Sequence, residues 1–159
     1  KANAYGHGLI KIAQHLEGLG AYYFGVAYLE EGIMLREAGV KTSILVLGGI
    51  IGNQIPLFIK HALTITASSI EKLKQIEQTA QSMGKKAIAH LKIDTGMERI
   101  GMHYYSAEAL LEESLKCKHT LIEGIFTHFA NADEEHQEDI ALEDLKELIK
   151  QFVLEALHN

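Results

Sequence analysis

Two lysines, one arginine and one histidine stand in stretches whose composition could support chemistry. Lys1 opens the segment KANAYGHG, Lys92 and Arg99 lie in LKIDTGMER, and His128 lies in IFTHFANADE. A lysine amine with glycines nearby can bind a carbonyl cofactor covalently, and a planar guanidinium suits bidentate recognition of a carboxylate. On residue types alone, a solvated Lys1 and a surface Arg99 remain the simpler interpretations.

Lys92 is harder to explain as a surface residue, because it falls inside the apolar run AIAHLKID. An ammonium group in such a strand must find a partner or lose its proton. Asp94 and Arg99 are its nearest charged companions in the sequence. Three interpretations of Lys92 follow: a structural ion pair, a second cofactor-binding amine, or a lysine modified so that it loses its positive charge.

His128, Asp133 and His136 are residue types that bind metal ions, but their spacing matches no helical or zinc-finger pattern. We therefore predict no metal site. Instead, His128 is expected to form hydrogen bonds at the mouth of the fold, and Asp133 is expected at the solvated start of a helix.

The residues between these positions alternate between strand-like and helical patterns. Continuous β-branched runs are typical of buried parallel strands, and Ser68 and Glu71 have the spacing of a capping box at a helix start. Apolar residues at helical spacing mark the helices. The predicted strands are 22–27, 43–48, 63–67, 87–94 and 121–129, and the predicted helices are 9–16, 29–39, 56–61, 68–83, 106–116 and 145–156.

This alternation predicts one α/β domain with a parallel sheet, either doubly wound or closed as a (β/α)8 barrel. The phosphate-binding pattern GxGxxG is absent, because GHG at 6–8 and GGIIG at 48–52 both miss its spacing. Lys1, the KIDTGMER segment and His128 fall at or just beyond the ends of predicted strands. Barrel enzymes carry their reactive side chains there, so these positions favour the barrel.

Composition narrows the choice of partners and compartment. A net charge of −6 supplies no broad positive field for a nucleic acid. The longest apolar stretch, 44–51, is too short to span a bilayer. With a single cysteine, Cys117, and no secretory or lipidation signal, the chain is expected to be cytoplasmic.

Taken together, KANAYGHG, VAYLEEGIMLREAG, ILVLG, LKIDTGMERIG and GIFTHFANADE resemble the bacterial alanine racemases, in that family's order and across almost the whole chain. The resemblance implies a fold-type III enzyme that depends on pyridoxal 5'-phosphate (PLP). Such an enzyme has an N-terminal (β/α)8 barrel and a C-terminal β domain. Residues 1–159 would then be most of the PLP-binding barrel.

The resemblance also implies roles for individual residues. Lys1 matches the lysine that binds PLP covalently and then exchanges a proton at Cα of the substrate. Arg99 matches the arginine that contacts the phenolic oxygen of the cofactor and the carboxylate of the substrate. Lys92 matches a lysine that is often carbamylated and orients that arginine. His128 matches a histidine that is hydrogen-bonded to a further arginine, which faces the pyridine nitrogen.

The remaining matches concern the walls of the pocket. Tyr5 matches a tyrosine that contacts the cofactor phosphate, Leu45 and Leu47 match apolar lining residues, and Met97 matches a residue near the substrate carboxylate.

The implied activity is the interconversion of L-alanine and D-alanine, which supplies D-alanine for peptidoglycan. The family acts as a homodimer, in which a tyrosine from the partner's C-terminal domain is the second acid–base group. The segment alone is therefore expected not to racemise alanine. The alternatives are a racemase for serine or for several amino acids, a PLP decarboxylase of basic amino acids, a noncatalytic PLP-binding protein and a barrel scaffold for protein interaction.

Overall fold

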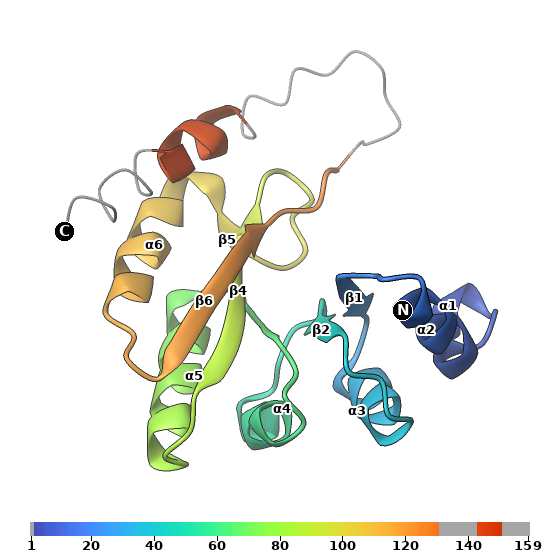
Figure 1. Cartoon of the computed structure of the whole chain (residues 1–159). Helices are drawn as coiled ribbons and strands as arrows, with labels where there is room; N and C mark the ends of the chain where they lie inside the picture. Colours follow the sequence, from blue (N-terminus) through green and yellow to red (C-terminus); the bar gives the residue numbers. More distant parts are fainter. Residues whose placement is uncertain (1, 131–142, 151–159) are drawn as a thin grey trace.

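The computed structural model describes residues 2–130 and 143–150, in which strands and helices alternate along the chain (Figure 1). The strands are β1 (Tyr23–Val26), β2 (Ser43–Val46), β3 (Ile65–Ala67), β4 (Ala87–Asp94), β5 (Met102–His103) and β6 (Thr120–Phe126). The α-helices are α1 (Ala2–Tyr5), α2 (Leu9–Gly18), α3 (Leu29–Glu37), α4 (Ile55–Lys60), α5 (Ile70–Ser82) and α6 (Ala107–Leu115). Two 3-10 turns, η1 (Gly52–Gln54) and η2 (Tyr104–Ser106), precede α4 and α6, and residues 143–150 are helical. Each predicted strand is confirmed, and the short strand β5 is additional.

The start of α5 differs from the prediction by one residue. The N-cap is Ser69, whose Oγ accepts a hydrogen bond from the N–H of Lys72 at 3.2 Å. Ser69 has the extended backbone that an N-cap requires. The predicted capping box from Ser68 to Glu71 was therefore wrong. The end of the last predicted helix, from residue 151 on, lies outside the described residues.

The main strands are parallel and neighbour one another in chain order. β1 pairs with β2, β3 with β4, and β4 with β6, all in parallel. A parallel bridge between Leu45 and Thr64 joins β2 to β3. The sheet therefore runs β1, β2, β3, β4, β6, without the reversal of strand order that a doubly wound sheet shows.

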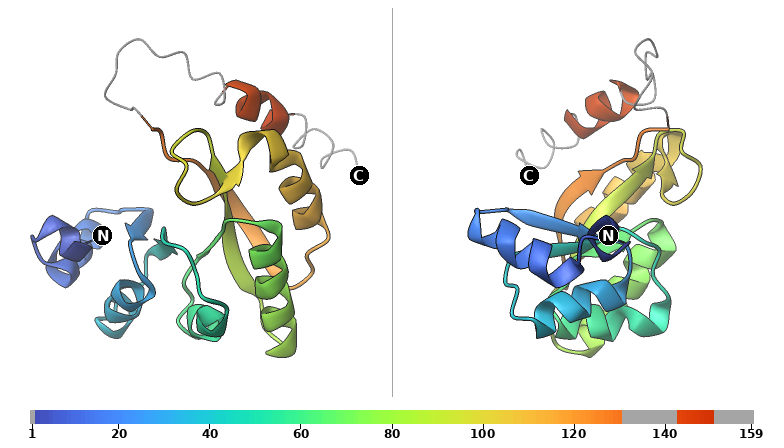
Figure 2. Two further views of the ribbon diagram at one scale, coloured as in Figure 1. Left: turned by 180° about the vertical axis from the view of Figure 1, so that it is seen from behind. Right: turned by 90° about the vertical axis from the view of Figure 1, so that its right-hand side faces the viewer.

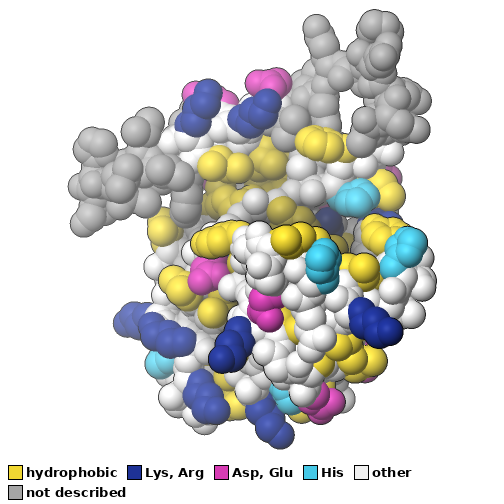
Figure 3. Space-filling model, turned by 45° about the vertical axis from the view of Figure 1, so that its right-hand side comes forward, with side chains coloured by type: hydrophobic (Ala, Val, Ile, Leu, Met, Phe, Trp, Pro, Cys, Tyr) yellow, Lys and Arg dark blue, Asp and Glu magenta, His cyan; other side chains and the backbone are white. Residues whose placement is uncertain are grey.

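The helices settle the architecture. In Figures 1 and 2, helices α3 to α6 follow the outer side of the curved sheet. A doubly wound fold needs helices on both faces of its sheet, whereas a (β/α)8 barrel keeps them all outside. The fold is thus part of a barrel, as predicted. Figure 3 shows hydrophobic side chains in a hollow across the middle of one face.

The hydrophobic core lies between the outer face of the sheet and the helices. In β4, Ala89, Leu91 and Ile93 are fully buried on that face, and they pack with residues of α5 and α6 such as Ile76 and Leu110. Alternate residues of a strand point to opposite faces. The other face of β4 therefore presents its polar residues to the inside of the barrel.

Charged side chains tie down the loops at the N-terminal ends of the strands. The guanidinium of Arg36 in α3 donates to the carbonyl oxygens of Val40, Thr42, His61 and Ala62 at 2.8 to 3.1 Å. Because these carbonyls precede β2 and β3, Arg36 fixes the entry of two neighbouring strands.

A carboxylate makes a similar contact one helix earlier. Glu17 at the end of α2 accepts hydrogen bonds from the N–H groups of Lys41 and Thr42 at 2.7 and 2.6 Å. These bonds are charge-assisted, which makes them stronger than neutral ones.

Within the described residues, no helix is long and apolar enough to cross a membrane.

Candidate functional site

The carboxyl ends of the strands lie along one edge of the sheet, because the strands are parallel. Within residues 2–130, a connection leaves this edge after each of the six strands, because β5 is also parallel to β4. The connections after β4 and β6 touch each other: the hydroxyl groups of Thr95 and Thr127 are 2.8 Å apart. This contact brings the loop that carries Arg99 beside the segment that carries His128.

The turn that follows Lys1 sits at the same edge, held by Glu31 of α3. One carboxylate oxygen of Glu31 accepts from the N–H of Asn3 at 2.9 Å, and the other accepts from the N–H of Ala27 at 2.8 Å. Ala27 directly follows β1. Burial alone would raise the pKa of Glu31, but the hydrogen bonds from Asn3 and Ala27 outweigh it and lower that pKa.

This turn has an unusual backbone. Ala2, Asn3, Ala4 and Tyr5 all have φ between 51° and 54°, in the left-handed region. Each such residue other than glycine costs roughly 1–2 kcal/mol. The side-chain oxygen of Asn3 accepts from the N–H of Leu9 at 2.8 Å, which helps to hold the turn. Strained backbone of this kind clusters at functional sites.

The inner face of β4 carries polar residues in a buried setting. Lys92 is only 6% exposed, and its Nζ lies 4.6 Å from the centre of the Phe126 ring on the paired strand. Lys92 therefore lies in the interior, as its sequence context predicted. Two residues earlier, the ring centre of His90 lies 5.3 Å from that of Tyr23. Burial lowers the pKa of His90, so this imidazole stays neutral over a wider pH range.

The loop after β4 folds around the side chain of Asp94, which is 4% exposed. Its carboxylate accepts hydrogen bonds from the N–H groups of Gly96, Glu98 and Arg99. Burial alone would raise the pKa of Asp94, but these three bonds lower it below its usual value. Asp94 is thus anionic at neutral pH.

Arg99 lies in a polar pocket of about 500 Å³ at the carboxyl ends of β2, β3 and β4. Its lining includes Ser68, Lys72, Asp94 and His103. A volume of this size is in the range of small-molecule sites. Lys72 and Arg99 contribute cationic side chains to the lining, and Asp94 and Glu98 contribute carboxylates, so the pocket carries charges of both signs.

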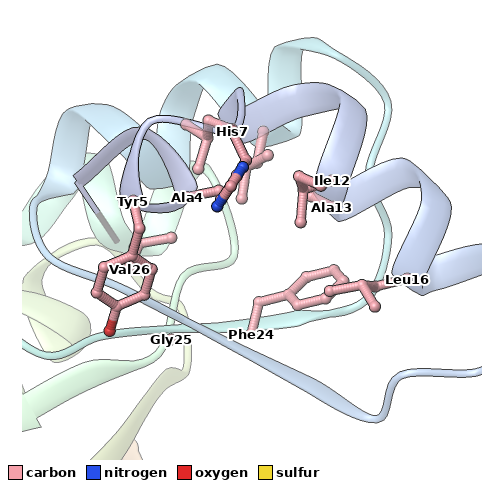
Figure 4. Close-up of a pocket in the computed structure, with 11 residues that line it drawn as sticks. Ala4, Tyr5, His7, Ile12, Ala13, Leu16, Phe24, Gly25 and Val26 are labelled. Atoms are coloured by element: carbon pink, nitrogen blue, oxygen red, sulfur yellow. The ribbon is translucent and has the colours of Figure 1, made fainter.

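A second pocket of about 310 Å³ is apolar and lies beneath α2. Figure 4 shows Tyr5 and Val26 toward one end of it, and Phe24 and Leu16 toward the other end. Tyr5 is 75% exposed, so its hydroxyl is accessible. Among the described residues, Lys92, Arg99 and His128 do not line this pocket.

The remaining predicted site residues lie at different places along the edge. Leu45 is buried, while Leu47 is half-buried and faces Gly25, where a Cβ atom would lie 3.2 Å from Leu47 Cδ1. Met97 is half-buried in the loop after β4, and His128 is exposed two residues beyond β6. Lys1, Asp133 and His136 lie outside the described residues.

Two contributors to this face were not identified from the sequence: Glu31 joins the KANAYGHG turn to the end of β1, and Tyr23 bonds the hydroxyl of Thr64 inside the sheet. Asp94, which the sequence marked as a charged companion of Lys92, shapes the Arg99 loop. No short-range pattern marks Glu31, because its partners are 4 and 28 residues away. Among residues 2–130 and 143–150, no three His, Cys, Asp or Glu side chains are grouped to hold a metal ion.

Fold and site together define a (β/α)-barrel domain with basic and polar side chains on the carboxyl edge of its parallel strands. The chain belongs to the family described as alanine racemase, N-terminal domain, whose model matches residues 1–158. It is 39% identical over 159 residues to alanine racemase 1 of Oceanobacillus iheyensis, and the match covers 100% of this chain and 42% of the relative.

Solved structures agree with this assignment. The chain is similar to alanine racemase of Clostridium difficile 630 in complex with cycloserine, with a TM-score of 0.84 and 36% identity over 97% of this chain and 42% of that one. It is also similar to histidine racemase from Leuconostoc mesenteroides subsp. sake, with a TM-score of 0.80 and 28% identity over 94% of this chain and 40% of that one. The chain therefore spans about two fifths of the length of the curated relatives and solved structures it matches.

Proposed function

We propose that the full-length gene product is an alanine racemase that uses PLP, and that residues 1–159 form most of its N-terminal barrel domain. The observation that carries the proposal is the contact between Thr95 and Thr127 at 2.8 Å. It joins the Arg99 loop to the His128 segment, in a chain that belongs to the alanine racemase family.

The residues present fit a bound PLP molecule. The side chains of Leu45 and Leu47 offer an apolar surface for the cofactor ring, and Leu47 packs closely over Gly25 on the paired strand. Tyr5 offers an accessible hydroxyl for the phosphate, and Arg99 offers a cation for the phenolic oxygen. When bound, PLP withdraws electrons from Cα of an amino acid and so acidifies its Cα hydrogen.

We assign each of these side chains a separate role in the reaction. Lys1 holds the cofactor through its amine and takes or returns the proton at Cα on one side of the substrate. Arg99 binds the substrate carboxylate, with Met97 beside it. Lys92, as a carbamate, orients Arg99 by opposite charge, and His128 forms a hydrogen bond near the pyridine end.

Further parts of the proposal concern the complete protein. We infer a cytoplasmic homodimer that supplies D-alanine for peptidoglycan, with a tyrosine of the partner subunit as the second acid–base group. A related activity on a larger amino acid is the second candidate, because the histidine racemase from Leuconostoc mesenteroides shares this fold at 28% identity.

The test is chiral analysis of L-alanine incubated with the purified full-length gene product and PLP. We expect D-alanine to form with the unaltered protein and not with Lys1→Ala, because the variant lacks the amine that holds the cofactor. L-Histidine and L-serine are assayed in parallel. Faster racemisation of either one would favour the second candidate, while bound PLP without any D-amino acid would favour a decarboxylase or a cofactor carrier.

A further inference from the structure

The loop that carries Met97 and Arg99 leaves β4 and returns beside the strand it left. Ile93 pairs with Met102 and Asp94 with His103, so β5 runs parallel to the end of β4. Between them the backbone turns through left-handed or similar conformations at Gly96 (φ 126°), Glu98 (φ 51°) and Gly101 (φ 135°). A loop of this shape is costly for a free chain and needs specific contacts to hold it.

Asp94 supplies such contacts from the centre of the loop. Its Oδ1 accepts from the N–H of Gly96 at 2.9 Å and from that of Glu98 at 3.1 Å. Its Oδ2 accepts from the N–H of Arg99 at 3.2 Å. The two oxygens therefore hold different residues, and Oδ2 alone holds Arg99.

The far end of the loop is fixed by close packing rather than by a side chain. A Cβ atom at Gly101 would lie 2.9 Å from the backbone nitrogen of Asp94 and 3.1 Å from the carbonyl oxygen of Lys92. Only glycine allows this approach without movement of the backbone. The loop is thus clamped between the Asp94 carboxylate and the Gly101 contact.

We propose that Asp94 is a positioning residue that sets the place of Arg99 through the hydrogen bond from the Arg99 N–H to Oδ2. This inference rests on the proposed function for its catalytic consequence, because Arg99 is the residue proposed to bind the substrate carboxylate. Asp94 itself stays buried beneath the loop and acts through the backbone.

The geometry makes Asp94→Asn a selective change. An asparagine keeps one oxygen, which can still accept from Gly96 and Glu98, but its NH2 group replaces Oδ2. That group is a donor and meets the donor N–H of Arg99, so this one bond is lost. A matched control is Glu77→Gln, which changes a carboxylate that accepts from the N–H groups of Lys118 and His119 at the opposite end of β6.

The experiment is residue-resolved amide hydrogen exchange on the full-length gene product, in the unaltered protein and both variants. In the unaltered protein, Gly96, Glu98 and Arg99 should exchange slowly. Met97 should exchange fast, because its N–H makes no hydrogen bond within the described part of the chain. In Asp94→Asn, the Arg99 amide should exchange about tenfold faster or more. In Glu77→Gln it should be unchanged.

Steady-state kinetics provide the second measurement. We expect Asp94→Asn to raise the KM for alanine more than it lowers kcat, because the guanidinium that binds the carboxylate is displaced while the cofactor amine is not. Glu77→Gln should keep both constants within about twofold, since Glu77 lies at the opposite end of the strands from Arg99.

The outcomes separate the two proposals. An unaltered protein that racemises no amino acid contradicts the proposed function, while the exchange pattern still decides the role of Asp94. Unchanged Arg99 exchange in Asp94→Asn overturns the positioning role. If that variant does not fold, equal exchange rates for Met97 and Arg99 in the unaltered protein overturn it as well.

Discussion

At the residue scale, carboxylates at one end of the strands support the fold, and carboxylates at the other end position the loops of the site. Glu17 and Glu77 accept backbone N–H groups before β2 and β6, at the end of the barrel that serves stability. Glu31 and Asp94 accept N–H groups after β1 and β4, at the end that carries the site. The same chemistry therefore supports the fold at one end and places functional loops at the other.

Lys92 is the residue whose chemical state matters most at this scale. A neutral amine can attack CO2, forming an N–C bond with release of a proton, and the Lys92 amine lies in a side chain that is only 6% exposed. We expect a carbamate signal in the 13C NMR spectrum of the full-length protein in 13C-labelled bicarbonate. The signal should vanish in Lys92→Ala and persist in Lys85→Ala, which removes an exposed lysine. A spectrum without such a signal contradicts carbamylation.

At the scale of elements, helices α2 and α3 each fix the entry of a strand beyond the next one along the chain. Arg36 of α3 bonds carbonyls before both β2 and β3, and Glu17 of α2 bonds the loop that Arg36 also holds. Such shared loops couple consecutive βα units.

Replacing Arg36 with alanine should lower the free energy of unfolding by about 2–4 kcal/mol, because four carbonyls lose a charged donor. Urea denaturation of the full-length protein measures the change. Lys74→Ala is the control: its partner Glu113 is contacted at 3.7 Å by a side chain that is 54% exposed, so the change should be below about 1 kcal/mol. Equal effects of both substitutions would contradict the role given to Arg36.

At the scale of the whole molecule, several carboxylates link stability to pH in the same direction. Hydrogen bonds from Thr42 and Lys41 lower the pKa of Glu17. For Glu77 and Asp94, burial acts to raise the pKa, but backbone hydrogen bonds outweigh it and lower that pKa. A lowered folded-state pKa means that the unfolded state binds more protons in acid. The stabilisation is therefore present above the unfolded pKa values near 4 and is lost as pH falls through the lower folded values.

We expect the thermal midpoint of the full-length protein to fall steadily as pH decreases below about 4.5. Glu77→Gln should have a lower midpoint at pH 6 and a smaller fall between pH 6 and pH 3, because the glutamine does not titrate. Thermal scans at a series of pH values measure both. Parallel curves for the two proteins would show that Glu77 makes no pH-dependent contribution.

The sequence by itself determined the elements and their type. The continuous apolar run at 43–48 predicted a buried parallel strand, and β2 lies within it, because burial on both sides requires continuous apolar residues. The strand predicted at 87–94 is β4. Local patterns also placed Arg99 and His128 at strand ends. They misplaced the cap of α5 by one residue, since Ser68 and Ser69 are chemically alike and only the backbone distinguishes them.

Tertiary structure alone decided between a barrel and a doubly wound sheet. The choice depends on which strands pair and on which face the helices lie, and periodicity within one element contains neither fact. It also decided which carboxylates matter at the site. The partners of Asp94 are within five residues in the sequence, but their N–H groups meet its carboxylate in a loop with left-handed turns. Glu31 meets Asn3 only after 28 residues of chain fold back. Contacts of that kind are set by the path of the whole chain, which no short window of sequence specifies.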